Sequence, residues 1–333
     1  MDRSDDLRSW RLFAAIAKTG SISSACAMFQ ADAANLSRQL SQFEGSLGAG
    51  PLLDRSVRPM ALTENGKAAF ECAQKMLQLR EDLTQRLNCD PQALSGVIRV
   101  GLPPMVLRDQ LTPFLMRFSE DYPEIDLRVD EYTGGLPIDF ENWRGDLFDV
   151  VVSYGPSSTN HNAVQIRYGE ELFMPCASPG YLKRFGTPKT PDDLADHVGI
   201  IVTNELRQAA PALVKNGQSV PIRFKRLIHF NSASTAKTAA LLGTGIHVNL
   251  PSLHCYQDIE AGTLVPLLKG WEQPRLALYI YSRPDCVKLA RVRLFIERYR
   301  RVMAQLRRHC HQVIAPWADN LPPIDEVLST CSN

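Results

Sequence analysis

The sequence has almost no excess charge, no long hydrophobic run and no paired-cysteine motif. Its 333 residues contain 37 basic and 36 acidic side chains, so overall charge directs the protein to no particular partner. No run of 18 apolar residues occurs, which argues against a transmembrane helix. The start, MDRSDDLRSW, is acidic and polar where a signal peptide needs a basic and then an apolar segment, and we therefore expect a cytoplasmic protein.

The signatures of common enzymes and cofactor sites are also missing. No P-loop, G-x-G-x-x-G turn or nucleophile elbow occurs, so the sequence predicts neither an enzyme nor a bound cofactor. The eight cysteines have no C-x-x-C spacing, and His309, Cys310 and His311 lack a second ligand pair, so no metal site is predicted. Such cysteines are mostly buried small hydrophobes or inert thiols in a reducing compartment. Redox sensing through Cys176 or Cys255 stays open as an alternative.

The first fifty residues contain three apolar patterns with helical spacing. The first spans Leu7 to Lys18 and stops at Gly20, a residue suited to the C-terminal cap of a helix. The second has apolar residues at positions 22, 25, 26 and 29, and the third at positions 36, 40, 43 and 47, with Asp32 as its expected N-cap. These patterns predict a helix-turn-helix preceded by one more helix.

The polar side of the third predicted helix can read DNA. Opposite its apolar stripe lie small or hydrogen-bonding residues and one guanidinium: Ala34, Ser37, Arg38, Ser41 and Gln42. Small residues permit close approach to a major groove, and an arginine there can bind guanine with two hydrogen bonds. A solvated helix face has a similar composition, and helix-turn-helix shapes also occur as plain packing motifs.

The next segment resembles a wing followed by a dimerisation helix. Two short extended pieces flank a basic turn, in which Arg55 and Arg58 can reach phosphates or the minor groove. Thr63 then caps a helix expected to run through about Asn88. Its near-heptad apolar seam predicts pairing with a second helix and consists of Ala69, Cys72, Met76, Leu79, Leu83 and Leu87. Because the first 90 residues hold 11 basic and 11 acidic side chains, DNA affinity has to come from their local arrangement.

The order and spacing of these motifs resemble the LysR-type transcriptional regulators. The segments that carry this resemblance are GSISSACAMF, NLSRQLSQFEGSLG, LLDRS and ALTENG. Where the family opens its recognition helix with Ser-Gln-Pro or Ser-Gln-Ser, this chain has Asp32, Ala33 and Ala34, so an unusual operator sequence is expected. The residues that we expect to contact DNA are Ser23, Asp32, Ala33, Ala34, Asn35, Ser37, Arg38, Ser41, Gln42, Arg55 and Arg58.

The remaining two-thirds alternates strand and helix patterns, which predicts an α/β fold with a mostly parallel sheet. It is similar to the family's effector domain, a two-lobe fold like that of periplasmic binding proteins. The expected divisions are a mostly α winged helix-turn-helix at 1–66, a linker and dimerisation helix at 67–95, an effector domain at 96–306 and a tail without assigned role at 307–333. Lobe I would hold 97–168 and 275–305, and lobe II 169–274.

The resemblance places a small-molecule site between the lobes, at the carboxyl ends of strands. The candidate residues are Pro103, Pro104, Met105, Tyr132, Thr133, Gly134, Thr203, Asn204, Ser232, Ala233 and Ser234. The two prolines remove backbone donors, which puts a simple carboxylate clamp in doubt. The segment 231–235 can serve as an anion-binding turn or as an ordinary helix cap.

The sequence thus predicts a DNA-binding regulator, dimeric or tetrameric, that a small effector controls. A regulator of the same architecture controlled by cysteine oxidation or by protein partners is one alternative. A small-molecule binding protein or an enzyme that uses the α/β domain alone is another. Double-stranded DNA, the effector and a second copy of the chain are the expected partners, RNA polymerase stays open as a further one, and no membrane is expected.

Overall fold

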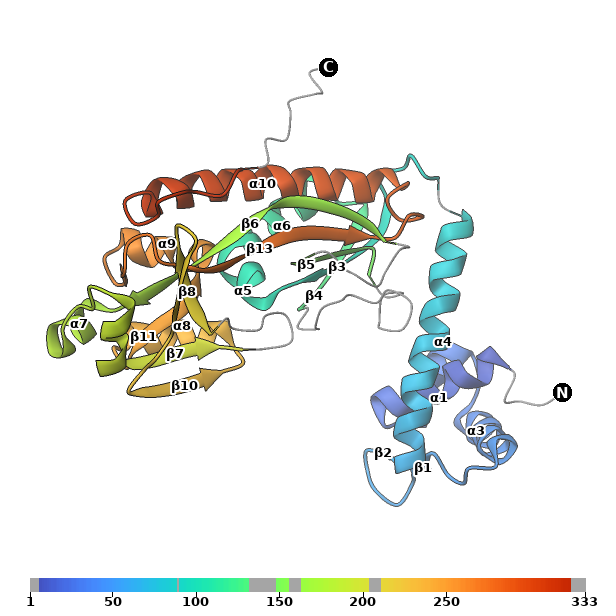
Figure 1. Cartoon of the computed structure of the whole chain (residues 1–333). Coiled ribbons are helices and arrows are strands. Elements are labelled where there is room, and N and C mark those ends of the chain that lie inside the picture. The colour runs from blue at the N-terminus through green and yellow to red at the C-terminus, as the bar shows by residue number, and fades with distance from the viewer. Residues whose placement is uncertain (1–5, 89, 132–147, 156–162, 204–210, 325–333) are drawn as a thin grey trace. The chain divides into compact units, whose positions relative to one another are not determined.

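The computed structural model describes residues 6–88, 90–131, 148–155, 163–203 and 211–324, without the side chains of 78, 81, 82, 85–88 and 109 (Figure 1). The chain forms two units, Met1–Cys89 and Asp90–Asn333. Within the described residues, no helix combines the length and the apolarity that crossing a bilayer requires.

The first unit contains the three predicted helices, a short hairpin and a long fourth helix. The helices are α1 (Leu7–Thr19), α2 (Ile22–Phe29), α3 (Ala33–Leu47) and α4 (Glu64–Asn88), and the hairpin pairs β1 (Leu53–Asp54) with β2 (Ala61–Leu62). The predicted caps are confirmed: Asp32 accepts a hydrogen bond from the Asn35 backbone N–H at 2.7 Å, and Gly20 ends α1 with a left-handed φ of 65°.

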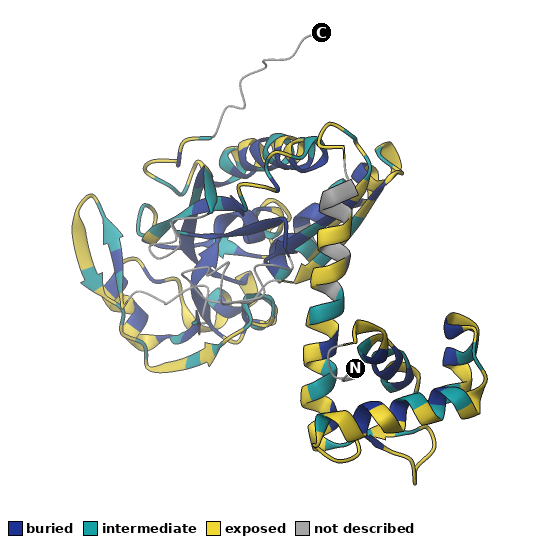
Figure 2. Ribbon diagram, turned by 90° about the vertical axis from the view of Figure 1, so that its right-hand side faces the viewer, coloured by how far each residue is buried: buried dark blue, intermediate teal, exposed yellow. Residues whose placement is uncertain are grey.

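One apolar core holds these helices together. Leu12, Phe13 and Ile16 of α1 are buried against Leu40 and Phe43 of α3, with Phe29 of α2 and Ala73 of α4 alongside. Each large side chain in such a core contributes about 1.5–3 kcal/mol by its burial. The helix α3 is therefore buried along one face, and its opposite face is left for solvent or for a partner (Figure 2).

The start of α4 is locked onto the hairpin by a close backbone approach. Thr63 accepts a hydrogen bond from the Gly66 N–H at 3.0 Å and donates its hydroxyl to the Pro51 carbonyl at 2.8 Å. A Cβ at Gly66 would lie 1.9 Å from the Leu52 carbonyl oxygen, so only glycine fits there. The segment ALTENG thus fixes how α4 leaves the hairpin.

The second unit is built on one mixed sheet with the strand order β10-β7-β11-β6-β13-β5-β3-β4, and β12 pairs with β6 at its side. Its strands are β3 (Gly96–Leu102), β4 (Ile125–Glu131), β5 (Val150–Tyr154), β6 (Val164–Ala177), β7 (Val198–Val202), β10 (Arg226–Phe230), β11 (Ile246–Pro251), β12 (Val265–Pro266) and β13 (Gln273–Ser282). A separate hairpin pairs β8 (Ala212–Lys215) with β9 (Gln218–Pro221).

The sheet is less parallel than the sequence predicts. The two ends, β10-β7-β11 and β5-β3-β4, are parallel, but β6 and β13 pair antiparallel with each other and with their neighbours. These two long strands carry the chain between the two ends, so they run opposite to each other (Figure 1). The sequence pattern shows that they are strands but does not show their direction, which explains the difference.

The helices of this unit are α5 (Pro104–Val106), the π-helical turn η2 (Leu107–Leu111), α6 (Thr112–Asp121), α7 (Pro179–Phe185), the 3-10 helix η4 (Pro191–Asp196), α8 (Ala233–Leu241), α9 (Ser252–Glu260) and α10 (Ala290–Ile314). The last helix, α10, continues past residue 306, where the sequence predicts the end of the effector domain, and it packs on both ends of the unit. Phe295 contacts Phe118 of α6 at 5.3 Å between ring centroids, whereas His309 contacts Tyr256 of α9 at 5.3 Å.

Candidate nucleic-acid interface and effector site

The outward face of α3 has the composition that the sequence predicts for a DNA-reading face. Ala33, Ala34, Arg38, Ser41 and Gln42 are exposed, and Asn35 and Ser37 are half-buried at its edge. Ser23 of α2 is exposed as well. Arg38 can extend its guanidinium beyond its small neighbours, so the face can enter a groove and donate hydrogen bonds to base edges.

The opening of α3 is occupied by its own cap. One carboxylate oxygen of Asp32 accepts from the Asn35 N–H, and the Asn35 side-chain carbonyl accepts from Gln39 Nε2 at 3.0 Å. Asp32 therefore stabilises the helix, and its charge would repel a nearby phosphate. The two alanines that follow offer only methyl groups, which suit contact with a thymine methyl.

The wing is tied to α3 by a carboxylate that the sequence analysis missed. Glu44 is only 8% exposed, and its Oε1 accepts from the backbone N–H groups of Leu52 at 2.9 Å and Leu53 at 3.3 Å. Its Oε2 accepts from Arg55 Nη2 at 2.7 Å, and Arg55 Nη1 donates to Ser41 Oγ at 3.0 Å. The sequence did offer one sign of this role: Glu44 is a charged residue that directly follows Phe43 of the apolar stripe.

The two wing arginines differ in surroundings. Arg55 is engaged by Glu44 and Ser41, whereas Arg58 is exposed and forms no ion pair with any described residue. The turn between them is shaped by Asp54, which accepts from the Ser56 N–H at 2.8 Å. The hydrogen bonds that Ser56 donates lower the pKa of the Asp54 carboxyl below its ordinary value.

The predicted seam of α4 is partly exposed. Leu79 is 52% and Leu83 is 57% exposed, with Cys72 exposed and Met76 half-buried beside them. Ala69 packs on the core of the first unit, and the Leu87 side chain lies outside the described residues. Adjoining α4, a groove of about 550 Å³ is lined by Asp6, Leu7, Arg8, Arg11, Met28, Phe29, Gln30 and Arg80. Exposed leucines in such a row are typical of a helix that pairs.

The predicted effector residues fall on two sides of the second unit. Pro103 and Met105 are buried and Pro104 is half-buried at the end of β3, while Thr203, Ser232, Ala233 and Ser234 are half-buried near β7 and α8. Arg108 of η2 joins the sides, because its Nη1 donates to Ser234 Oγ at 2.6 Å. Tyr132, Thr133, Gly134 and Asn204 lie outside the described residues. Sequence reasoning missed Arg108, because nothing in its sequence surroundings distinguishes it from other helical arginines.

The junction between the two sides is closely packed. Gln110 Nε2 donates to the Leu253 carbonyl of α9 at 2.9 Å, and the adjoining cavity has about 10 Å³, room for about one water molecule. Pro103, Ser153 and Leu253 line it, and the buried Ser153 hydroxyl has no hydrogen-bond partner among the described residues.

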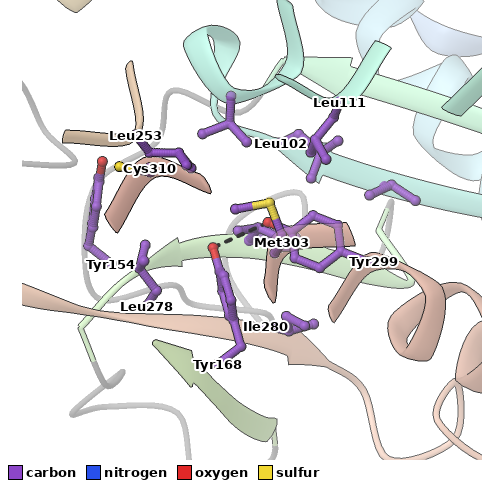
Figure 3. Packing of buried hydrophobic residues seen from close by; sticks show 14 of the residues in the cluster. Leu102, Leu111, Tyr154, Tyr168, Leu253, Leu278, Ile280, Tyr299, Met303 and Cys310 are labelled. Carbon is purple, nitrogen blue, oxygen red and sulfur yellow. Dashed lines mark hydrogen bonds between the residues drawn. The ribbon is translucent and has the colours of Figure 1, made fainter. Parts of the chain in front are cut away.

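A buried polar group extends from this cavity under α10. Glu171 of β6 accepts from Ser252 Oγ at 2.9 Å and lies 3.5 Å from Arg307. Nearby, the Tyr299 hydroxyl donates to the Tyr168 hydroxyl at 3.2 Å (Figure 3), and burial raises the pKa of Tyr168 to about 12. Polar and ionic contacts thus connect β6, α9 and α10 in this part of the second unit.

Comparison with known proteins agrees with this arrangement. The family described as "Bacterial regulatory helix-turn-helix protein, lysR family" matches residues 7–67, and "LysR substrate binding domain" matches residues 91–304. The HTH-type transcriptional regulator YhjC of Escherichia coli (strain K12) is 28% identical over 295 residues, which cover 88% of this chain and 96% of that protein. The regulator CrgA of Neisseria meningitidis serogroup C is 28% identical over 292 residues, with 86% and 93% covered.

A solved structure shares the fold. The full-length Vibrio cholerae virulence activator AphB superposes with a TM-score of 0.58 at 23% identity, covering 90% of this chain and 98% of that one.

A winged helix-turn-helix followed by a two-lobe α/β unit defines a DNA-binding regulator with a ligand-sensing domain. The chain belongs to the LysR family. It is a LysR-type transcriptional regulator with a DNA-binding and a substrate-binding domain, and its regulation is of the effector-modulated kind.

Proposed function

We propose that this regulator reads its operator with the outward face of α3, centred on Ser37, Arg38, Ser41 and Gln42. The observation that carries the proposal is the division of α3, whose stripe from Leu36 to Phe43 is buried while the opposite face is exposed. The loss of Ser-Gln at the opening, replaced by a capping Asp32 and two alanines, supports an operator that differs from those of relatives.

The wing supplies the electrostatic part of DNA binding. Arg58 is exposed and unpaired by any described carboxylate, so it is suited to a phosphate or to a narrow minor groove. Because the first 90 residues carry equal numbers of basic and acidic side chains, a few such groups have to provide most of the favourable charge interaction. Two copies on one operator would double that number.

Dimerisation through α4 would provide the second copy. The exposed Leu79 and Leu83 lie one helical turn apart and form one stripe, which is the surface that a second helix would cover. The division into 1–66, 67–95, 96–306 and 307–333 is part of the same proposal. A dimer places two reading faces on two half-sites. Tetramers and contact with RNA polymerase remain compatible extensions of this arrangement.

The effector would bind where Arg108 meets the N-terminal end of α8. A guanidinium, the Ser234 hydroxyl and a helix N-terminus favour an anionic group on the ligand. Pro103 and Pro104 supply apolar surface on the opposite side and no backbone N–H. An apolar or aromatic molecule with one anionic end fits this chemistry, and it would have to separate Arg108 from Ser234.

Control by cysteine oxidation is less well supported. Cys176, Cys255 and Cys310 are buried, and burial raises the pKa of Cys255 well above its ordinary value and that of Cys310 to about 12. The thiols of Cys255 and Cys310 therefore form little of the reactive thiolate at neutral pH. Alkylation of the native protein with iodoacetamide and peptide mapping tests this: Cys72 should be modified before these three. Prompt labelling of Cys255 at neutral pH would restore the redox alternative.

We infer no catalytic role, since the relatives are transcriptional regulators. The operator would be bacterial chromosomal DNA, which makes the cytoplasm the compartment of action.

The reading face is tested by electrophoretic mobility shift on the DNA upstream of the protein's own gene. The wild type should form a salt-sensitive complex, and Arg38→Ala should weaken specific binding by about 1–3 kcal/mol while relaxing discrimination at one base pair. The control Arg117→Ala removes an exposed arginine of the second unit and should leave the complex unchanged. An Arg38→Ala complex with wild-type affinity and specificity would show that this face does not read DNA.

A further inference from the structure

We propose that Arg55, an expected DNA contact, is instead a positioning residue that fixes the wing to the recognition helix through Glu44. The proposal rests on the DNA-binding function proposed above. It assigns the two wing arginines different tasks, with Arg55 holding the wing in place and Arg58 meeting the DNA backbone.

The contacts around Glu44 form a closed connection between α3 and β1. One carboxylate oxygen accepts hydrogen bonds from the backbone N–H groups of Leu52 and Leu53, where the chain enters β1. The other carboxylate oxygen accepts a hydrogen bond from Arg55, the first residue after β1. A single side chain of α3 thus holds both the beginning and the end of the first wing strand.

The burial of Glu44 makes this connection dependent on charge. The carboxylate side chain is 9% exposed, while that of Arg55 is 38% exposed. A buried carboxylate is stable when backbone N–H groups and a cation satisfy its oxygens. Arg55 is the cation that does this, so its charge is already balanced by a carboxylate of the protein and Arg55 should release few counterions from DNA.

Arg55 also orients part of the reading face. Its second terminal nitrogen donates to Ser41 Oγ, so this hydroxyl keeps its own proton for donation outward. The planar guanidinium reaches Glu44 and Ser41 at the same time. A lysine, with one point-like ammonium group, cannot reproduce both contacts with that geometry.

Salt dependence of DNA binding separates positioning from phosphate contact. Arg58→Ala should lower the steepness of log K against log salt by about 0.9 for each subunit on the DNA, since one phosphate contact is lost. Arg55→Ala should reduce affinity at least tenfold and leave the steepness unchanged. Arg55→Lys should behave like Arg55→Ala. The lysine keeps the positive charge but cannot contact Glu44 and Ser41 at the same time.

Glu44→Gln gives the sharpest contrast. If Arg55 positions the wing, this variant weakens DNA binding, and the double variant Arg55→Ala with Glu44→Gln is no weaker than the worse single variant. If Arg55 is a phosphate ligand, removal of its carboxylate partner frees its charge and strengthens binding.

Amide hydrogen exchange of the DNA-free protein gives a second readout. The amides of Leu52 and Leu53 should exchange faster in Arg55→Ala and Glu44→Gln than in Arg58→Ala, with the α1 and α3 core amides unchanged. Unchanged exchange at Leu52 and Leu53, or a loss of steepness in Arg55→Ala equal to that in Arg58→Ala, would overturn the positioning role. Absence of any wild-type complex would instead overturn the proposed DNA reading, and the exchange measurement would still decide whether Arg55 holds the wing.

Discussion

The guanidinium of Arg307 lies 3.5 Å from the carboxylate of Glu171, with side-chain exposures of 4% and 3%. Arg307 comes from α10, Glu171 from β6, and Ser252 and Leu253 at the start of α9 complete the carboxylate's hydrogen bonds. The pair therefore connects the C-terminal helix, a strand that crosses between the ends of the sheet, and a helix of the second end.

Removing one member of this pair should be far more damaging than removing both. Arg307→Met leaves Glu171 buried without its cation, and we expect a loss of about 3–5 kcal/mol in the unfolding free energy of the second unit. The double variant Arg307→Met with Glu171→Gln should recover part of that loss, because no uncompensated charge remains. Denaturant unfolding followed by tryptophan fluorescence measures both. Equal stability of the single and double variants would show that the charge pair is energetically unimportant.

Two glycines of the first unit should respond oppositely to alanine. Gly66→Ala places a Cβ against the Leu52 carbonyl and should destabilise the first unit by about 1–3 kcal/mol. Gly45 lies in α3, and a Cβ added there would meet no described atom within 4 Å, so Gly45→Ala should stabilise by about 0.5–1 kcal/mol. Differential scanning calorimetry resolves the transition of the first unit. A neutral Gly66→Ala would mean that α4 can move away from the hairpin at little cost.

The exposed stripe on α4 should control self-association. Leu79→Arg combined with Leu83→Arg places charge on a surface that pairing would bury, and should raise the dimer dissociation constant at least about 100-fold. Gln74→Arg, an exposed change on the same helix and outside the stripe, should leave it unchanged. Sedimentation velocity over a concentration series distinguishes them. A leucine double variant that stays dimeric would move the interface elsewhere.

His311 should make the second unit less stable in mild acid. Burial, followed by the nearby Arg307 and Arg275, lowers its pKa from 6.5 to about 4. The folded state keeps the imidazole neutral down to about pH 4, while the unfolded chain binds a proton near pH 6.5. The stabilising contribution is therefore complete above pH 6.5 and disappears as the pH falls to about 4.

The expected loss over that window is about 1–2 kcal/mol, since solvent screens a half-buried group. His311→Gln should flatten the fall in unfolding free energy between these pH values, measured by denaturant titration. His229→Gln, at an exposed position of β10, is the control and should keep the wild-type slope. An unchanged slope in His311→Gln would assign the acid sensitivity to other groups.

The first unit could be predicted almost completely from local sequence. The apolar periods of α1, α2 and α3, the cap at Asp32 and the turn at Gly20 are all satisfied within a few residues, so neighbouring sequence reports them. The exposure of Ala34, Arg38 and Gln42 follows from the same period. Glu44 was missed because its partners come from β1 and the wing, and helical spacing carries no information about them.

The effector region was predicted less well for a related reason. Strand and helix patterns identified most elements, but the antiparallel direction of β6 and β13 depends on which strands meet in space. The same holds for Arg108 with Ser234, which are 126 residues apart, and for Glu171 with Arg307, which are 136 apart. Residues 307–314 of the predicted tail continue α10, and the Trp317 carbonyl beyond them accepts a hydrogen bond from the Gly270 N–H at 2.9 Å.

The sequence by itself thus determined the kind of protein, through its resemblance to a known family. It also determined the helical pattern of the first unit and the α/β pattern of the second, because these depend on periodicity and caps within short stretches. Only the tertiary structure decided that Glu44 captures Arg55, that Arg108 reaches Ser234 and that Arg307 is buried against Glu171. Each of these pairs joins charged or polar groups from separate elements, and the free energy of burying them depends on partners that only folding brings within hydrogen-bonding distance.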